Sequence, residues 1–234
     1  MKTDTFHVKG KEITLYHAAN ADSPLILFNH FSGEGEAVMA EARKLSNRDF
    51  SLLCVGNVDW NHDMSPWHCP PIMPGDAEYT GGADVHLQLL VEEILPEGLR
   101  RLEGKPSHIG IAGYSLAGLF ALYALYRTNV FDRAASVSGS LWYPEFRDYV
   151  QSHEMKRKPE KLYISLGDKE AKTRNPLMRA VDTALLMQRG ALDAQNIPNE
   201  LEWNPGNHFV DAALRTAKGH AAMIRTLRSM PAHS

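Results

Sequence analysis

The sequence predicts an α/β protein with a mostly parallel central sheet, an N-terminal antiparallel hairpin and helices on both faces of the sheet. Three observations support this. Segments typical of strands alternate with segments typical of helices along most of the chain. Several expected strands are continuous apolar runs, which indicates burial on both faces. No linker, repeat or low-complexity tract divides the 234 residues, so residues 1–234 are expected to form a single domain.

The first expected elements form a hairpin. Residues 5–8 and 12–16 are rich in β-branched and aromatic residues, and Gly10 between them is typical of a tight turn. The apolar runs 24–29 and 51–55 predict buried strands, with a helix between them over residues 35–45.

Residues 59–82 interrupt this alternation, because they are rich in Trp, His and Pro and follow neither helical nor strand periodicity. Long ordered loops of this kind are often functional. A long amphipathic helix is expected next over 83–102, with Pro96 and Gly98 as interruptions. The remaining expected elements are strands at 108–113, 135–138, 161–166 and 200–203, and helices at 116–127, 176–195 and 209–228.

Composition excludes several classes of protein. The chain has 44% hydrophobic and 23% charged residues, which is near the globular average, and 25 basic against 28 acidic residues give a net charge of -3. Such a chain lacks the positive field that binds nucleic acid or an anionic membrane surface, so neither partner is expected. Cys54 and Cys69 form no disulfide framework and lack zinc-site spacing. With no apolar run typical of a secretory signal or membrane span, a cytoplasmic location is expected.

The motif most informative about chemistry is the run of residues 113–118, Gly-Tyr-Ser-Leu-Ala-Gly, between an expected strand and an expected helix. It fits the nucleophile elbow, in which a serine occupies a tight, strained turn. Gly113 and Ala117 are small because the chain passes close to itself there. This geometry lifts the Ser115 hydroxyl clear of the sheet, and the N–H of Leu116 at the helix start is free to stabilise an oxyanion.

A serine nucleophile needs a base and an orienting acid, in the chain order Ser, Asp/Glu, His. His208 lies among turn residues after the last expected strand, which suits a catalytic imidazole, whereas His220 lies within a helix and is expected at the surface. The acid is expected after the strand 161–166, where Glu170 is favoured and Asp168 is the alternative.

The loop after the strand 24–29 is expected to supply the second oxyanion donor, from the backbone N–H of Phe31 or Ser32. Scattered histidines near this loop and in 59–82 do not indicate a metal site, and no cofactor is expected. Five aromatic residues suggest a largely neutral, ring-lined substrate pocket. They are Trp60, Trp67, Tyr79, Trp142 and Tyr143.

With these residues in view, the chain from about 24 to 225 resembles the putative-esterase family of α/β-hydrolases, which includes esterase D-like enzymes and ferric-siderophore esterases. The resemblance is carried by Gly-Gly-Ala-Asp at 81–84 before a helix, the elbow continuing through 119–123, Ser-Val-Ser-Gly-Ser-Leu-Trp-Tyr at 136–143, and Gly-Asn-His-Phe at 206–209. It implies carboxylic-ester hydrolysis by a triad of Ser115, Glu170 or Asp168, and His208. Residues 59–82 contain no Lys or Arg, which argues against an anionic ferric siderophore as the substrate.

The leading hypothesis is therefore a cofactor-independent serine esterase of the α/β-hydrolase fold that acts on a small-molecule ester. Two alternatives are acyl transfer to an acceptor other than water by the same triad, and a non-catalytic binding protein that retains the fold. The sequence leaves the identity of the ester and the oligomeric state open.

Overall fold

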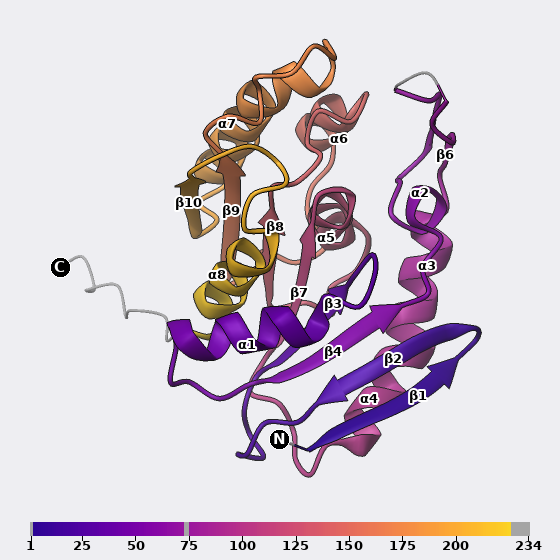
Figure 1. Ribbon diagram of the computed structural model, residues 1–234, viewed down its shortest axis with the longest axis vertical. Helices are drawn as coiled ribbons and strands as arrows, with labels where there is room; N and C mark the ends of the chain where they lie inside the picture. The colour runs from indigo at the N-terminus through magenta and orange to yellow at the C-terminus, as the bar shows by residue number, and fades with distance from the viewer. Residues whose placement is uncertain (1, 73–74, 226–234) are drawn as a thin grey trace, which may run out of the picture.

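The computed structural model describes residues 2–72 and 75–225, arranged as shown in Figure 1. An eight-stranded sheet in the order β1-β2-β4-β3-β7-β8-β9-β10 forms the centre of this described part. The β1–β2 and β2–β4 pairs are antiparallel, and the other neighbouring pairs are parallel. The strands are β1 (Thr3–Val8), β2 (Lys11–Tyr16), β3 (Leu25–Asn29), β4 (Ser51–Gly56), β7 (Ile109–Tyr114), β8 (Arg133–Val137), β9 (Lys161–Gly167) and β10 (Asn199–Asn204). The predicted mostly parallel sheet with an N-terminal hairpin is confirmed.

The helices connect these strands and lie in two layers. Their bounds are α1 (Gly35–Leu45), α2 (Trp60–Asp63), α3 (Ala83–Leu89), η1 (Leu90–Ile94), α4 (Leu95–Arg101), α5 (Leu116–Arg127), α6 (Phe146–Ser152), η2 (Met178–Ala180), α7 (Val181–Ala194) and α8 (Ala212–Ile224). In Figure 1, α1 and α8 cover one face of the sheet, and α5 lies behind the other.

Alternate residues of the buried strands pack into opposite layers. Leu25 and Leu27 of β3 belong to the core cluster that includes residues of α3 to α7, whereas Ile26 and Phe28 belong to the cluster that includes α1 and α8. Because both faces of the sheet are covered by helices, successive side chains of these strands are all buried. This explains why the strands appear in the sequence as unbroken apolar runs.

Three expected elements differ in detail. The helix expected over 83–102 is divided into α3, the π-helical η1 and α4, because Pro96 has no N–H with which to continue the α-helical ladder. The region 59–82 contains α2 and a short ribbon of β5 (His68–Cys69) and β6 (Tyr79–Thr80). Of the helix expected over 209–228, residues 226–228 lie outside the described part.

The parallel strands place the loops that follow them along one edge of the sheet. The loops after β3, β7, β9 and β10 therefore lie near one another, as they do in open α/β sheets that bind ligands at this edge. Among the described residues, no helix is both long and apolar enough to span a bilayer.

Candidate active site

Ser115 occupies a strained turn between β7 and α5. Its backbone has φ 59° and ψ −123°, a region that non-glycine residues rarely adopt. A Cβ atom on Gly113 would lie 2.1 Å from the carbonyl oxygen of Ala117, so a larger residue there would force the turn open. The strain and the close approach are the geometry that the small residues of the motif predict.

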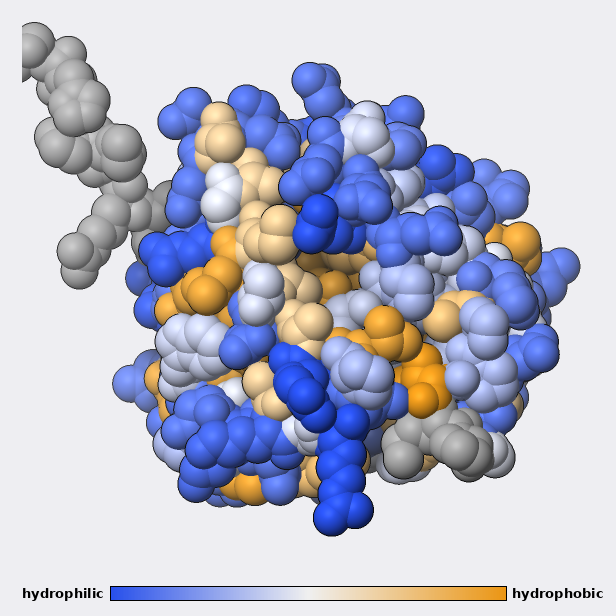
Figure 2. Space-filling model, turned by 90° about the horizontal axis from the view of Figure 1, so that it is seen from above, coloured by the Kyte–Doolittle hydropathy of each residue, from blue (hydrophilic) through white to orange (hydrophobic). Residues whose placement is uncertain are grey.

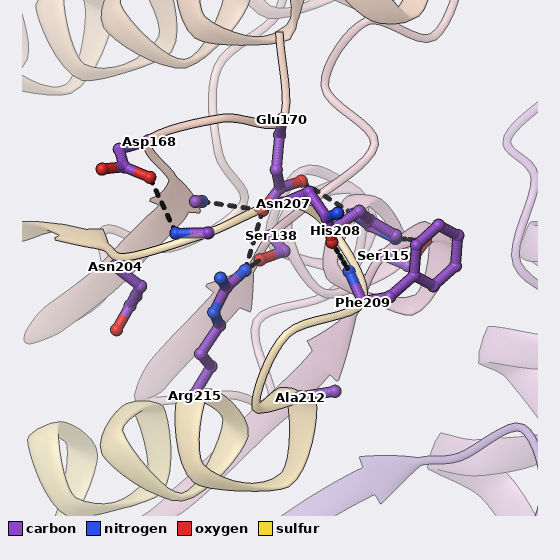
Figure 3. A network of polar contacts seen from close by, with 12 residues as sticks. Ser115, Ser138, Asp168, Glu170, Asn204, Asn207, His208, Phe209, Ala212 and Arg215 are labelled. Carbon is purple, nitrogen blue, oxygen red and sulfur yellow. Dashed lines mark hydrogen bonds and ion pairs between the residues drawn. The ribbon is translucent and has the colours of Figure 1, made fainter. Parts of the chain in front are cut away.

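The His208 imidazole links Ser115 to Glu170 (Figure 3). Its Nε2 lies 3.0 Å from Oγ of Ser115, and its Nδ1 lies 2.7 Å from Oε2 of Glu170. An ionised carboxylate only accepts hydrogen bonds, so Nδ1–H is the donor to Glu170 and Nε2 is left to accept from the serine hydroxyl. Glu170 is 4% exposed and His208 is 28% exposed, so the acid is covered and the base opens onto the cleft.

Several donors hold the Glu170 carboxylate in its charged form. Burial alone would raise the pKa of Glu170, but the hydrogen bond from His208 and the backbone N–H of Gly167 outweigh burial and hold that pKa below its usual value. Arg215 lies 3.1 Å from the other carboxylate oxygen, Oε1. The site therefore presents an anion to the imidazole.

Asp168, the alternative acid, faces a different group. Its Oδ1 accepts a hydrogen bond of 2.7 Å from the backbone N–H of Gly206 and so joins the loop after β9 to the loop after β10. Of the two acid candidates, the structure brings Glu170 to His208.

The expected oxyanion donors come from the start of α5 and from the loop after β3. Leu116 is the first residue of α5, so its N–H has no carbonyl one turn earlier within the helix. In the loop after β3, the N–H of Ser32 donates 2.8 Å to the side chain of Glu34. Phe31 lines the cleft beside Ser115 and His208, which makes its N–H the better-placed second donor of the two considered.

The cleft has two sides that meet at Ser115 and His208. One side, of about 410 Å³, includes Lys169, Lys172 and Trp142. The other, of about 360 Å³, is mostly apolar and is lined by residues of β3, α1, the loop 30–34 and the start of α8. Trp60 lies between them and contributes to both. Figure 2 looks onto this edge and shows apolar surface in a central hollow with hydrophilic surroundings.

The five predicted substrate-contacting aromatic residues separate into two groups. Trp60, Tyr79 and Trp142 line the cleft. Trp67 and Tyr143 are not among the residues that line it, which corrects the prediction for both: Tyr143 is buried, and Trp67 is half-buried and packs against the core. They pack with their ring centroids 6.0 Å apart, and the Tyr143 hydroxyl donates to the carbonyl of Trp67 while the Trp67 indole N–H donates to that of Pro144. These bonds join 59–82 to the segment before α6 from the inside.

His220 also differs from the expectation. It was expected at the surface of a helix, but it is fully buried between Phe28 and Phe50, with ring centroids 5.5 and 6.1 Å away. The reason is that α8 packs on β7, β8 and β9 with α1 beside it in the same layer, so the side of α8 that carries His220 is covered. Burial lowers the pKa of His220 to about 3.

Three basic residues at the site escaped the sequence reasoning. Lys169 and Lys172 line the cleft from the loop after β9, although residues 59–82 supply no basic side chain. Arg215 is 1% exposed behind Glu170. In the sequence it is one of several charged residues in the helix expected over 209–228, and no local pattern sets it apart.

Within the described part of the chain, no group of three or more His, Cys, Asp or Glu side chains is placed to hold a metal ion. The polar groups that converge on the cleft are instead a hydroxyl, an imidazole and a carboxylate in series.

Comparison with known proteins is consistent across sequence and structure. Residues 33–211 match the model of the family described as Putative esterase. The uncharacterized protein YbbA of Bacillus subtilis (strain 168) is 22% identical over 133 residues, which are 55% of this chain and 53% of YbbA, so the match spans about half of that relative's length.

Solved structures with the same fold include siderophore hydrolase EstB from Aspergillus nidulans, at 19% identity and a TM-score of 0.74, with 95% of each chain covered. Another is an IroE-like serine hydrolase from Shewanella oneidensis, at 15% identity and a TM-score of 0.75, with 95% of this chain and 79% of that one covered. At these identities the likeness shows the α/β-hydrolase fold. Because the family model covers most of the sequence, the chain belongs to the Putative esterase family of α/β-hydrolases.

Proposed function

We propose that this protein is a serine hydrolase that cleaves a carboxylic ester of a small molecule through Ser115, His208 and Glu170. The observation that carries the proposal is the His208 imidazole, with one nitrogen 3.0 Å from the serine hydroxyl and the other 2.7 Å from the carboxylate. Such a series turns a weak hydroxyl nucleophile into an effective one.

The reaction follows from these contacts in two halves. Oγ of Ser115 attacks the ester carbonyl carbon while Nε2 of His208 takes the serine proton. The carbonyl oxygen becomes an oxyanion facing the N–H groups of Leu116 and Phe31. The imidazolium, held by Glu170, then gives its proton to the departing alcohol, and an acyl-enzyme remains. Water, deprotonated by His208, attacks the acyl-enzyme and releases the acid and the free serine.

Water is the acceptor that the rim of the cleft favours. Phe31 and Phe209 line the cleft with Ser115 and are 64% and 87% exposed, so the cleft is open to solvent beside the nucleophile. An acyltransferase that uses the same triad must instead keep water away from its acyl-enzyme. Adding alcohols to the assay and measuring how the acyl group partitions between water and alcohol tests this point.

The two unlike sides of the cleft suggest the kind of ester. One arm of the substrate is apolar and lies along Phe28 and Val38, while the other is polar or anionic and lies near Lys169 and Lys172. A panel of aryl esters that varies acyl length and adds a carboxylate to one arm tests this assignment. Equal kcat/KM across the panel would contradict it.

The function itself is tested by Ser115→Ala in hydrolysis of p-nitrophenyl acetate. We expect a loss on the order of 10⁶-fold in kcat with an unchanged melting temperature, as in comparable triads. Ser140 supplies a matched control, because its hydroxyl lies 3.5 Å from that of Ser115. Ser140→Ala should stay within tenfold of the wild type. A clean preparation of Ser115→Ala that keeps more than a few per cent of the activity contradicts the proposal.

A further inference from the structure

Arg215 is a buried cation that the reaction above does not use. It lies in the first turns of α8 and is 1% exposed. A guanidinium taken out of water is unfavourable unless it is closely paired, and a buried ion pair is often no more stable than well-packed apolar residues. Stability alone therefore gives little reason for an arginine at this position.

Most side-chain contacts of Arg215 lead to segments that hold the candidate triad, and one leads to Ser138 after β8 (Figure 3). Nη1 lies 3.1 Å from Oε1 of Glu170 and 3.3 Å from Oγ of Ser138. Nη2 donates 2.6 Å to the carbonyl of Pro205, three residues before His208. A single planar fork therefore holds the acid and the loop that carries the base.

A second connection reaches the nucleophile. Tyr114, the residue before Ser115, has its hydroxyl 3.5 Å from Nη1 of Arg215 and donates 2.6 Å to the carbonyl of His208. The Arg215 guanidinium and the Glu170 carboxylate are closely packed against the backbone. A Cβ atom on Gly167 would lie 2.9 Å from both Arg215 Nη1 and Glu170 Oε1.

We propose, on the basis of the function given above, that Arg215 is a positioning residue for ester hydrolysis. Its guanidinium donates a hydrogen bond to Oε1 of Glu170 and so leaves Oε2 oriented toward His208. It fixes the distance between the acid and the His208 loop through Pro205. Its positive charge also opposes the uptake of a proton by the Glu170–His208 pair, so the pair stays ready to act as a base at lower pH.

The titratable groups around this pair come from several elements. Tyr114 faces it from β7, and burial raises the pKa of Tyr114 above its usual value, so this phenol stays neutral in the relevant range. The other charged or titratable neighbours in the cleft and adjoining loops are His30, Glu34, Asp168, Lys169, Lys172 and Arg215. Arg215 is the one in direct contact with Glu170.

The test compares Arg215→Met, which removes the positive charge, with Arg215→Lys. The lysine keeps the charge but replaces the planar guanidinium with one ammonium group. For p-nitrophenyl acetate, we expect Arg215→Met to lose about 100-fold in kcat per titrated active site, with KM within about threefold. The acid limb of its kcat/KM profile should move up by about one pH unit, because an opposite charge beside an acid has effects of this size. Arg215→Lys should lose less in kcat and keep the wild-type acid limb.

Arg133→Met is the matched control. Arg133 is also buried, at 7% exposure, and pairs with Glu160 at 3.2 Å, but it lies at the amino end of β8, away from Ser115. Its replacement should lower the melting temperature and leave the pH profile unchanged. An unmoved acid limb in Arg215→Met, or a kcat loss no larger than in Arg133→Met, overturns the inference.

Three further outcomes are separable. If Arg215→Met does not fold, Arg215→Lys decides: a lower kcat per titrated site at unchanged KM supports positioning, and a wild-type kcat overturns it. If Ser115→Ala is as active as the wild type, the proposed function fails regardless of Arg215. If Ser115→Ala is inactive and Arg215→Met behaves as wild type, only this inference fails.

Discussion

Exchanging the Glu170 carboxylate for an amide should disable the candidate base while leaving the fold intact. In Glu170→Gln the side chain has one acceptor oxygen and one NH₂ group to place. The Oε1 position is surrounded by two donors, the N–H of Gly167 at 2.7 Å and Nη1 of Arg215 at 3.1 Å, so the amide oxygen must take that position. The NH₂ group then faces Nδ1 of His208, where Oε2 now accepts at 2.7 Å.

This arrangement fixes the wrong tautomer of the imidazole. Nδ1 has to accept from the amide, so the ring proton moves to Nε2, which can no longer take the proton of Ser115. The same exchange in a serine protease triad costs on the order of 10⁴-fold in kcat. At 1.36 kcal/mol for each factor of ten, that is about 5 kcal/mol of transition-state stabilisation.

The assay is kcat/KM for p-nitrophenyl acetate, with the melting temperature as the check on folding. Asp168→Asn is the matched control, since an asparagine oxygen can still accept from the N–H of Gly206, and it should remain within a few fold of the wild type. The reasoning is refuted if Asp168→Asn is the inactive variant and Glu170→Gln is close to wild type.

Three other perturbations test where individual ring side chains lie. Trp60→Ala should raise KM for bulky esters by roughly 10–200-fold relative to acetyl esters, because this ring lines both sides of the cleft. Trp67→Ala should instead lower the free energy of unfolding by about 3–5 kcal/mol and affect all esters alike; the reverse pattern, read from kinetics on an ester series and from denaturant unfolding, would contradict the assignment. For His220, the folded-state pKa of about 3 lies below the unfolded value of about 6.5, so its contribution to stability is present above about pH 6.5 and is lost as the pH falls toward 3. Between pH 8 and pH 5 the wild type should therefore lose about 2 kcal/mol more stability in denaturant titrations than His220→Leu, and equal losses would show that the buried ring is not the cause.

The parts of the site that could be predicted are those whose requirements are local in the chain. A serine at φ 59° needs small neighbours within a few residues, so Gly113 and Ala117 are visible in the sequence. The buried strands are visible for a similar reason, since covering both faces of a sheet produces unbroken apolar runs. These local demands identify the fold and the position of the elbow.

The remaining features depend on contacts between distant segments. Asp168 and Glu170 lie two residues apart, and which of them faces His208 depends on Gly206 and Arg215 from other elements. The sequence of a long loop does not distinguish an aromatic residue that faces the cleft from one that packs against the core. The contacts of Trp67 with Tyr143 and Pro144, from a distant segment, make that distinction.

His220 shows the limit of helical periodicity. The pattern of α8 does not reveal that a second helix, α1, packs beside it on the same face of the sheet. The lysines of the cleft do not come from 59–82, the loop expected to contact the substrate. They come from the loop after β9, which only the folded sheet brings to the same edge.

Labelling with a fluorophosphonate probe tests the central claim most directly, because the probe reacts with a serine only where a base and an oxyanion site already activate it. The account predicts one adduct per chain, mapped by peptide mass spectrometry to Ser115, absent from Ser115→Ala and formed much more slowly in Glu170→Gln. A folded wild-type protein that forms no adduct, or that is labelled at another residue such as Ser140, would contradict it.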